Sequence, residues 1–499
     1  MCGIAALWGA SDRSLIEGML EAQGHRGPDG RGTMQSGGGQ GVLGHCRLAI
    51  IDPEGGAQPL NGAEGGWSLV ANGMIYNDLA IRERHAGAPF KSKSDSESIL
   101  HSIARDGTRA VADLDGMFAF VMTDGRDLIA ARDPVGIKPL YMGRRDGALA
   151  FASEIGALAG PFDSIEEFPA GHVLDTRTGL EAYYTVPDAT PDKWRLDDAL
   201  AAVRETLERA VVKRLRSDVP FGALLSGGLD SSIIAALAAR VIPNLKTFAV
   251  GFEGSPDLLA ARLVARHIGS DHRELVITPR QVLQELPQIL RHLESFDQDL
   301  VRSAVPCWFV SRFAAEQVKV VLTGEGADEL FAGYTYYRDI ADPEILAEEL
   351  RRSIGQMHSI NLQRVDRMSM AHGLEARVPF LDRETIALGL SLPVEWKLTQ
   401  AGGRRVEKWV LRKAFEDLLP NEIVWRDKLQ FDQGSGVADY VIHEIDRLAR
   451  EADVPINGAR SAEEAYYRSL LAESCETPQP ILDLVDHWDT RIPAAEAHR

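Results

Sequence analysis

The sequence has few cysteines, no long apolar run and no excess of positive charge. Its 499 residues include only Cys2, Cys46, Cys307 and Cys475. Their spacing fits neither a disulfide framework nor a zinc site, which favours a reducing compartment. No apolar run reaches the roughly 18 residues of a membrane span, and the N-terminus lacks the basic and apolar regions of a signal peptide. We therefore expect a cytoplasmic protein without a membrane partner.

The balance of charges is acidic, with 54 Lys and Arg against 73 Asp and Glu and a net charge of −19. Phosphate contacts along a nucleic acid need clustered Lys and Arg, so we expect no nucleic-acid partner. A hydrophobic content of 45% is ordinary for a globular protein. The length allows two to four domains, each with its own core.

Residues 2–184 are expected to form a mostly β domain. Glycine-rich turns such as 36–39 separate short apolar segments, and helical patterns are fewer. The strands are expected near 67–71, 117–122, 127–131 and 148–152, and the helices at 14–22 and 96–104. This pattern predicts stacked sheets with helices outside.

Residues 185–197 contain two prolines and little periodicity, and are interpreted as a linker. Beyond it, apolar residues recur at helical spacing from Leu200 to Leu215, and short strands then alternate with helices. The strands are expected at 219–225, 247–251 and 318–322, and the helices at 233–240 and 258–268. This alternation predicts a parallel sheet over 198–440 with its ligand at the carboxyl ends of the strands. Beyond residue 340 the chain is expected to be mainly helical, with a helical tail at 441–499.

The stretch 225–232 lies between such a strand and such a helix. Its glycines let the backbone approach a ligand, and the free N–H groups of a helix start attract anions. Three hydroxyls add short donors. The residues expected to hold phosphate are Leu225, Ser226, Gly227, Gly228, Asp230, Ser231 and Ser232. An ordinary Ser/Gly turn is the plainer alternative.

This stretch differs from the common P-loop because no lysine follows the glycines. A carboxylate among phosphates, here Asp230, requires Mg²⁺ between them. The stretch resembles the pyrophosphate loop of ATP pyrophosphatases. That resemblance implies adenylation of a carboxylate with release of pyrophosphate.

The second candidate site begins at Cys2, which becomes the first residue once Met1 is cleaved. Its α-amino group, with a pKa near 7.7–8.0, can then act as general base for its own thiol. Taken alone, such a cysteine is better explained as an accident of the terminus or as a small buried residue.

Motifs at 25–30, 47–50, 72–77 and 94–97 follow Cys2 in order. Together they resemble the class II glutamine amidotransferase domain, an N-terminal nucleophile fold with an αββα sandwich, over residues 2–184. The resemblance implies that Cys2 attacks the amide of glutamine and releases ammonia. It places Asn72 and Gly73 in the oxyanion hole, Arg47 on the glutamine carboxylate and Asp95 on its amino group.

Each of these residues has a simpler alternative role. Arg47 suits a surface ion pair, Asp95 a helix cap, and 72–73 a hairpin turn. One departure from the resemblance is Met74, where members of the family often carry glutamate.

A glutaminase domain followed by a pyrophosphatase domain resembles the glutamine-hydrolysing asparagine synthetase family. Further strings at 321–331, 375–382 and 425–431 agree, so the resemblance extends to about residue 440. It implies an adenine nucleotide alpha hydrolase-like second domain, with glutamine, aspartate and ATP as substrates. It also implies an internal route for ammonia, and homodimers are common in the family.

The resemblance further assigns roles in the second domain. Asp230 and Asp328 would bind Mg²⁺, Lys428 would add positive charge at the phosphates, and Glu325 would be the general base. A carboxylate at a helix start is the alternative role of Glu325. The remaining ATP contacts would be Leu225, Val250, Thr323 and Gly324.

The sequence defines the acid that accepts the ammonia less well than it defines glutamine and ATP. Arg302 could hold its carboxylate, but Asp299 and Leu300 stand where related bacterial enzymes often have two threonines. Such an exchange can change which acid fits. The alternatives are therefore an enzyme that amidates another carboxylate in secondary metabolism, or an inactive homologue that serves as a binding module. Complete sets of catalytic residues argue against the second alternative.

Overall fold

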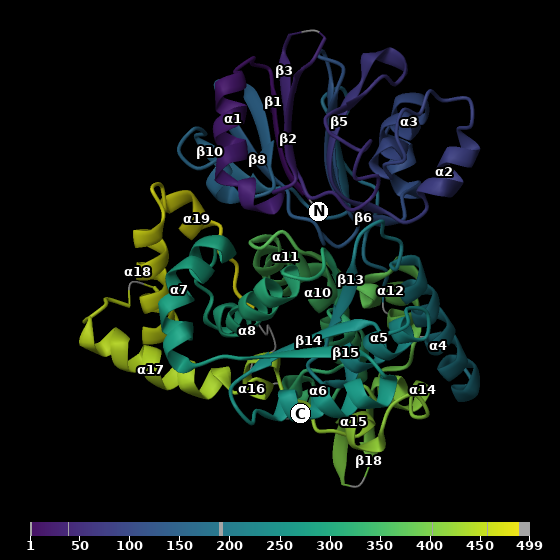
Figure 1. Cartoon of the computed structure of the whole chain (residues 1–499), viewed down its shortest axis with the longest axis vertical. Helices are drawn as coiled ribbons and strands as arrows, with labels where there is room; N and C mark the ends of the chain where they lie inside the picture. Colours follow the sequence, from purple (N-terminus) through teal and green to yellow (C-terminus); the bar gives the residue numbers. More distant parts are fainter. Residues whose placement is uncertain (1, 38, 189–192, 402, 457, 489–499) are drawn as a thin grey trace.

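The computed structural model describes residues 2–37, 39–188, 193–401, 403–456 and 458–488. Figure 1 shows two bodies stacked along the long axis, the N-terminal one above and the C-terminal one below. Met1, Gly38 of the glycine-rich turn, part of the expected linker and the end of the expected tail lie outside the described residues.

The N-terminal body is built from two antiparallel sheets that face each other. The first has the order β10 (Ser164–Glu167), β8 (Tyr141–Arg145), β9 (Ala148–Ala152), β1 (Cys2–Trp8), β3 (Gly41–Arg47) and β2 (Gly30–Gln35). The second has the order β12 (Gly179–Ala182), β11 (His172–Asp175), β7 (Leu128–Arg132), β6 (Gly116–Thr123), β5 (Ser68–Ile75) and β4 (Leu60–Asn61). Ile4 and Leu43 of one sheet meet Val70 and Val121 of the other in a buried cluster. Alternating apolar strands thus bury one face of each sheet against the other.

Helices cover the outer faces of these sheets (Figure 1). Helix α1 (Arg13–Ala22) packs on β1 and β3, while α3 (Ser96–Asp106) packs on β5 beside α2 (Asp78–Arg84). Asp12 caps α1 by accepting a hydrogen bond from the Leu15 N–H. The layers are therefore helix, sheet, sheet, helix, and the predicted αββα sandwich is confirmed.

The C-terminal body contains a parallel sheet, as its strand and helix alternation predicts. Its order is β15 (Asp271–Val276), β14 (Lys246–Gly251), β13 (Phe221–Leu224), β16 (Val320–Leu322) and β17 (Glu375–Arg377). The order reverses between β13 and β16, and ligands bind at such a switch point beyond the carboxyl ends of the strands. The strand β17 lies in the region expected to be mainly helical, because three residues give too short a pattern to detect.

Helices surround this sheet on both sides in Figure 1. Those before β17 are α4 (Leu196–Lys213), α5 (Leu229–Ala239), α6 (Pro256–Ile268), α7 (Pro279–Leu293), α8 (Gln298–Ala315), α9 (Ala327–Phe331), α10 (Pro343–Gln356) and α11 (Asn361–Met370). Those after it are α12 (Arg383–Ser391), α13 (Val394–Lys397), α14 (Trp409–Ala414), α15 (Asn421–Val424) and α16 (Phe431–Gly434), with the hairpin β18 (Leu398–Ala401) and β19 (Arg404–Glu407). Helix α4 begins at Leu196, so the last two residues of the expected linker are helical.

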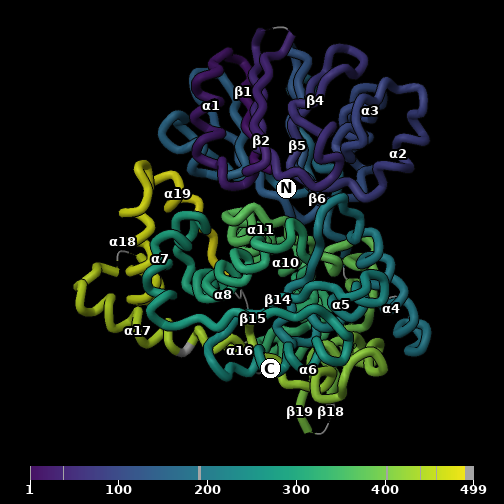
Figure 2. The backbone as a smooth tube through the Cα atoms, in the orientation of Figure 1, coloured from purple at the N-terminus to yellow at the C-terminus, as the bar shows by residue number. Residues whose placement is uncertain are grey.

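The tail is an integral part of the C-terminal body. Its helices are α17 (Val437–Glu451), α18 (Ala462–Ser474) and α19 (Gln479–Asp483). Both α17 and α18 pack against α7 and α8, beside which they appear in yellow in Figure 2. The expected domain boundary at residue 440 falls inside α17, because an amphipathic helix must bury its apolar side against the preceding helices.

A buried ion network joins the two bodies. Arg26, fully buried in the N-terminal body, donates to Glu154 Oε1 at 2.9 Å and to Asp366 Oδ1 of α11 at 2.6 Å. Arg367, also on α11, lies 3.1 Å from the same Glu154 oxygen and donates to Glu294 at 2.6 Å. Buried charges are costly unless they are paired, so this network fixes α11 against the N-terminal body.

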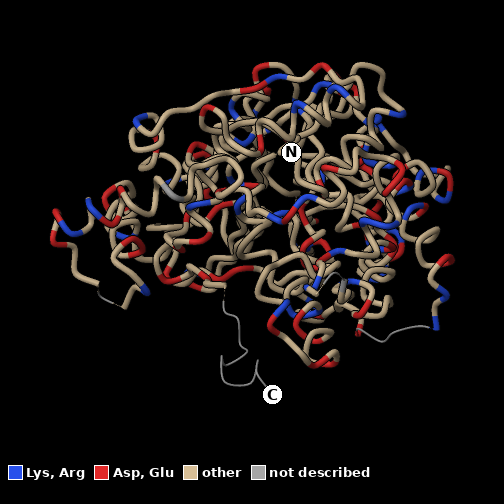
Figure 3. The backbone as a smooth tube through the Cα atoms, turned by 90° about the horizontal axis from the view of Figure 1, so that it is seen from below, with Lys and Arg blue, Asp and Glu red and all other residues tan. Residues whose placement is uncertain are grey.

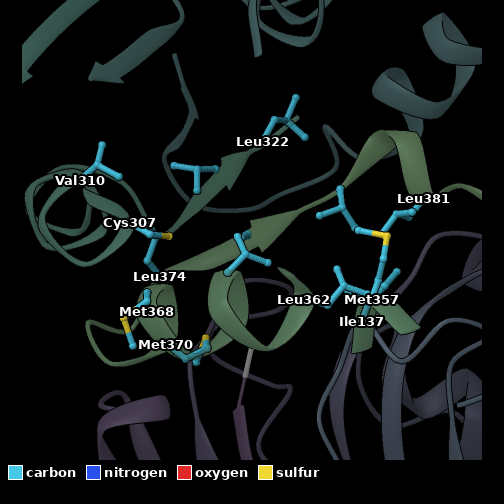
Figure 4. Close-up of a cluster of buried hydrophobic side chains, with 14 of the residues drawn as sticks. Ile137, Cys307, Val310, Leu322, Met357, Leu362, Met368, Met370, Leu374 and Leu381 are labelled. Carbon is cyan, nitrogen blue, oxygen red and sulfur yellow. The ribbon is translucent and has the colours of Figure 1, made fainter. Parts of the chain in front are cut away.

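Apolar side chains complete the contact between the bodies. Figure 4 shows Ile137 of the N-terminal body beside Met357, which precedes α11, and Leu362 in the first turn of α11. All three are buried. On the outside, acidic and basic segments alternate along the tube in Figure 3. Charges of both signs are thus mixed over the outside of the molecule.

The buried guanidinium of Arg377 supports a stability prediction. It donates to the Arg214 and Arg216 carbonyls at 2.6 Å each and to Glu375 at 2.6 Å. Arg377→Ala strips these buried groups of their donor, so we expect a loss of about 3–5 kcal/mol in free energy of unfolding. Urea denaturation followed by tryptophan fluorescence measures it.

The matched control is Arg31→Ala, which removes an exposed ion pair with Glu21. We expect a change below about 1 kcal/mol for this variant. Equal losses in the two variants would contradict the role given to the buried guanidinium.

Candidate active sites

A narrow pocket in the N-terminal body gathers residues that the sequence predicted. Cys2 opens β1 beside Arg47 at the end of β3, and both line the pocket with Gly73 and Asp95. Glu375, at the start of β17 in the other body, lines it too. Sequence reasoning missed Glu375 because only the docking of the two bodies brings it there.

Cys2 and Asn72 form a close pair. The nitrogen of Cys2, the α-amino group once Met1 is cleaved, donates to Asn72 Oδ1 at 2.9 Å. Asn72 is fully buried, and its Nδ2 has no hydrogen-bond partner among the described residues. Burial raises the pKa of the Cys2 thiol, while a hydrogen bond from Leu48 opposes the rise. The resting thiol is therefore protonated, and a base must take its proton before attack.

Gly73 lies within β5 and not in a hairpin turn. Its φ is 157°, and a Cβ there would lie 2.1 Å from the carbonyl oxygen of Met117. Only glycine therefore fits, and the backbone can approach a ligand closely. The neighbouring Met74, the departure noted in the sequence, also lines the pocket.

Asp95 does not cap α3 with its side chain. Its Oδ2 instead accepts a hydrogen bond from the Ile75 N–H at 2.7 Å. Burial raises the pKa of Asp95 to about 6, the Ile75 bond opposes this, and the nearby Glu375 charge adds to it. Arg47 donates to the Asp52 and Pro53 carbonyls at 2.6 and 2.8 Å, so it also holds the loop that walls the pocket.

A larger cavity of about 500 Å³ lies at the switch point of the parallel sheet. That volume is typical of small-molecule sites. Its lining includes the predicted residues Leu225, Ser226, Gly228, Asp230, Ser231, Val250, Thr323, Gly324, Glu325, Asp328 and Lys428. The loop after β13 and the loop after β16 thus meet at one edge.

Two predicted loop residues lie behind this lining. Gly227 has φ of 72°, and a Cβ there would lie 2.4 Å from the Ala261 nitrogen, so it allows the loop to pack on α6. Ser232 is fully buried, with no partner for its hydroxyl among the described residues. Ser226 and Ser231 share a 3.0 Å hydrogen bond at the front of the loop.

Two lysines hold the carboxylates of the cavity. Lys408, 1% exposed, contacts both Asp230 and Asp328 at 2.6 Å. Lys428 donates to the other Asp328 oxygen at 2.7 Å. Burial alone would raise the pKa of Asp328, but the two ammonium groups lower it, so the group stays ionised. Sequence reasoning missed Lys408 because this lysine belongs to no recognised motif and lies in a turn far along the chain from Asp230 and Asp328.

These carboxylates fit a divalent cation. Oxygen ligands are what Mg²⁺ prefers, and Asp230 Oδ1 is buried without a hydrogen-bond partner among the described residues. Asp230 lies in the first turn of α5, where the N–H groups of the helix start suit the anionic partner of such a cation.

Glu325 faces Arg364 of α11 across the cavity, and the two side chains form an ion pair. Burial raises the pKa of Glu325, and the Arg364 charge opposes the rise. Its neighbour Glu329 accepts hydrogen bonds from Tyr334 at 2.6 Å and Asn361 at 2.8 Å. Arg364 lines the cavity but was not among the predicted residues.

Arg302 differs from its prediction. Its guanidinium is paired with two carboxylates. Nε donates to Glu463 at 2.9 Å, and Nη1 donates to Asp299 at 3.3 Å. Arg302 is absent from the residues that line the cavity in the described chain, whereas Asp299 and Leu300 are present. Residues on a helix point in different directions, so spacing alone could not tell which of them reaches the cavity.

Comparison with known proteins gives matches over nearly the whole chain. The glutamine amidotransferase domain matches residues 1–169, and asparagine synthase matches residues 202–345 and 338–480. Asparagine synthetase [glutamine-hydrolyzing] 3 of Arabidopsis thaliana is 39% identical, covering 94% of this chain and 87% of the relative. The corresponding enzyme of Sandersonia aurantiaca is 37% identical, covering 95% and 96%.

Among solved structures, the chain is similar to glutamine phosphoribosylpyrophosphate amidotransferase from B. subtilis. The TM-score is 0.33 at 21% identity, over 49% of this chain and 65% of that chain. This similarity is too low to carry an argument.

The raised pKa of Asp95 predicts a pH dependence. An ammonium group is held by the ionised carboxylate, and Asp95 becomes protonated as the pH falls through about 6. We therefore expect the KM for glutamine to rise about tenfold per pH unit below that value. Glutamate release measured between pH 5 and 8 tests this.

Asp95→Asn is the control, because an amide does not titrate. Its KM should be high throughout and lack this inflection. An inflection that persists in Asp95→Asn would assign the titration to another group.

Proposed function

We propose, because the chain belongs to the glutamine-hydrolysing asparagine synthetase family, that it makes asparagine from aspartate, glutamine and ATP. The observation that carries this proposal is the presence of both half-sites. A buried thiol lies beside an amide donor in one body, and a phosphate-binding loop lies beside paired carboxylates in the other.

In the N-terminal half, Cys2 attacks the side-chain amide carbon of glutamine. The α-amino group of Cys2 takes the thiol proton and passes it to the leaving nitrogen. The Asn72 Nδ2, which lacks a partner among the described residues, and the Gly73 N–H stabilise the oxyanion. Water then hydrolyses the thioester to glutamate. Arg47 and Asp95 hold the carboxylate and amino group of glutamine.

In the C-terminal half, the aspartate β-carboxylate attacks the α-phosphorus of ATP and pyrophosphate leaves. The loop 225–232 holds the phosphates with its N–H groups and hydroxyls. Asp230 and Asp328 would hold Mg²⁺, which supplies charge neutralisation for the pyrophosphate. Lys408 and Lys428 place two further positive charges at the same point.

Ammonia next attacks the acyl-adenylate carbonyl and must lose a proton. Glu325 is suited to accept it, because burial raises the pKa of this carboxylate. Arg364 has its guanidinium beside Glu325 in the cavity. We propose that Arg364, rather than Arg302, binds a carboxylate of the acceptor, since its planar fork matches that group.

The adjacent strands β16 and β17 support an internal route for ammonia. Glu375 begins β17 at the glutamine pocket. Strand β16 runs parallel to β17, and Thr323 and Glu325, which follow β16, line the ATP cavity. The apolar side chains of Figure 4 lie around these strands. Such surroundings favour neutral ammonia over ammonium.

The proposed setting is the cytoplasm. The four cysteines are free thiols, which suits a reducing compartment. No helix among the described residues is long and apolar enough to span a membrane. A homodimer is proposed from the family resemblance alone.

Cys2→Ala separates the two half-reactions. We expect glutamine-driven synthesis to fall by about 10³-fold or more, because the nucleophile is lost. Ammonia-driven synthesis should keep its rate, since the ATP cavity is untouched. The measurement is asparagine formed with each nitrogen donor.

Cys475→Ala removes a half-buried thiol outside both pockets and is the matched control. It should leave both rates unchanged. Undiminished glutamine-driven synthesis in Cys2→Ala would refute the assignment of the nucleophile.

Transfer of label identifies the acceptor. Incubation with ATP, Mg²⁺, aspartate and ¹⁵N-amide glutamine should place the label in asparagine. A panel of other acids should release pyrophosphate at least about tenfold more slowly, since a missing or extra polar group disfavours binding. Faster release with another acid would instead favour amidation of that acid.

A further inference from the structure

The chain returns to the ATP cavity at its C-terminal end. After α19, residues 484–488 run without regular structure and end at Trp488, which lines the cavity. Asp486 accepts a hydrogen bond from the Ser359 hydroxyl at 2.7 Å, and His487 Nδ1 lies 3.0 Å from Asp297 Oδ2. We call residues 484–488 the C-terminal segment.

The Trp488 ring is held on two sides. The Tyr334 ring meets it edge-on, with centroids 5.7 Å apart and planes at 60°, and the Arg352 guanidinium lies 5.5 Å from its centroid. Tyr334 in turn accepts a hydrogen bond from Asn361 at 2.6 Å. These contacts fix a large apolar surface at the cavity.

Trp488 is connected to helix α11 through Tyr334 and Asn361. Asn361 and Arg364 are three residues apart on α11 and therefore share one helix face. Trp488 is thus linked through Tyr334 and Asn361 to the same face as the guanidinium proposed to bind the acceptor.

His487 is anchored on Asp297, which lies next to cavity-lining residues of α8. Asp297 caps α8 by accepting from the Leu300 N–H at 2.8 Å, and Asp299 and Leu300 line the cavity. Asp297, Glu464 and His487 lie close enough together for a metal site. Arg460, however, already contacts Asp297 at 2.5 Å and Glu464 at 2.7 Å, so the cluster is an ion-pair clasp.

We propose that the C-terminal segment is a wall of the acceptor subsite and that Trp488 is a positioning residue which keeps water from the acyl-adenylate. This inference rests on the proposed function. Without the wall, a water oxygen attacks the acyl carbon and the bond from that carbon to the AMP oxygen breaks. The acid and AMP leave with release of a proton, so ATP and water give AMP and pyrophosphate without amide. Excluding water from a reactive intermediate prevents this loss.

The test uses the full chain with aspartate, ATP, Mg²⁺ and ammonium, so the glutamine pocket plays no part. Asparagine and pyrophosphate are measured together. In Trp488→Ala we expect the ratio of asparagine to pyrophosphate to fall about twofold or more. The KM for aspartate should rise about tenfold, as for a lost apolar contact in a pocket. Trp488→Phe retains an aromatic wall and should restore most of the ratio.

His487→Ala tests the same wall through its anchor, without changing a cavity-lining side chain. It should lower the ratio in the same direction, while glutamine hydrolysis to glutamate stays at the wild-type rate in all variants. Wild-type ratios and KM values in both Trp488→Ala and His487→Ala would overturn the proposal. A wild-type enzyme that released no pyrophosphate with aspartate would overturn the proposed acceptor instead, and the wall would be tested with the acid that does release it.

Discussion

The structure depends on the buried ion network between its two bodies. Arg26 donates through Nε to the Cys2 carbonyl at 3.1 Å and through its other nitrogens to Glu154 and Asp366. One guanidinium therefore contacts the nucleophile and the helix α11. That helix presents Arg364 to the ATP cavity. Because each of these charges is costly to bury alone, the bodies have one favourable arrangement, and the two sites keep a fixed separation.

In the ATP cavity, two lysines are paired with two carboxylates. Asp230 and Asp328 lie in the first turns of two different helices, α5 and α9, and would repel each other. Lys408 and Lys428 neutralise them at the place where a nucleotide would add negative phosphate charge and its cation positive charge. Gly333 makes this possible, since a Cβ there would lie 2.0 Å from Asp328 and 2.1 Å from Lys408. The charged groups of the site are thus in place before a substrate binds, which lowers the free energy of reorganisation during the reaction.

Much of the architecture was predictable because the local patterns are strong. Alternating strands predicted stacked sheets with outer helices and a parallel sheet, the family resemblance implied the αββα sandwich, and these features are confirmed. Features that leave only a weak pattern in the sequence, or that depend on distant residues, were predicted less accurately. The strand β17 is too short to detect, and the boundary at residue 440 divides a helix whose burial depends on α7 and α8. Arg302 faces Glu463 because helix rotation, not sequence position, selects its partner.

The sequence by itself determined which chemical groups are available: a thiol near the amino end, hydroxyls and N–H groups at a helix start, and carboxylates after two strands. These follow from local backbone geometry, which neighbouring residues set. Only the tertiary structure decided what meets them. Lys408, Arg364, Glu375 and Trp488 arrive at the two pockets from distant segments. Their positions follow from packing and charge pairing across the whole chain, which no local pattern encodes.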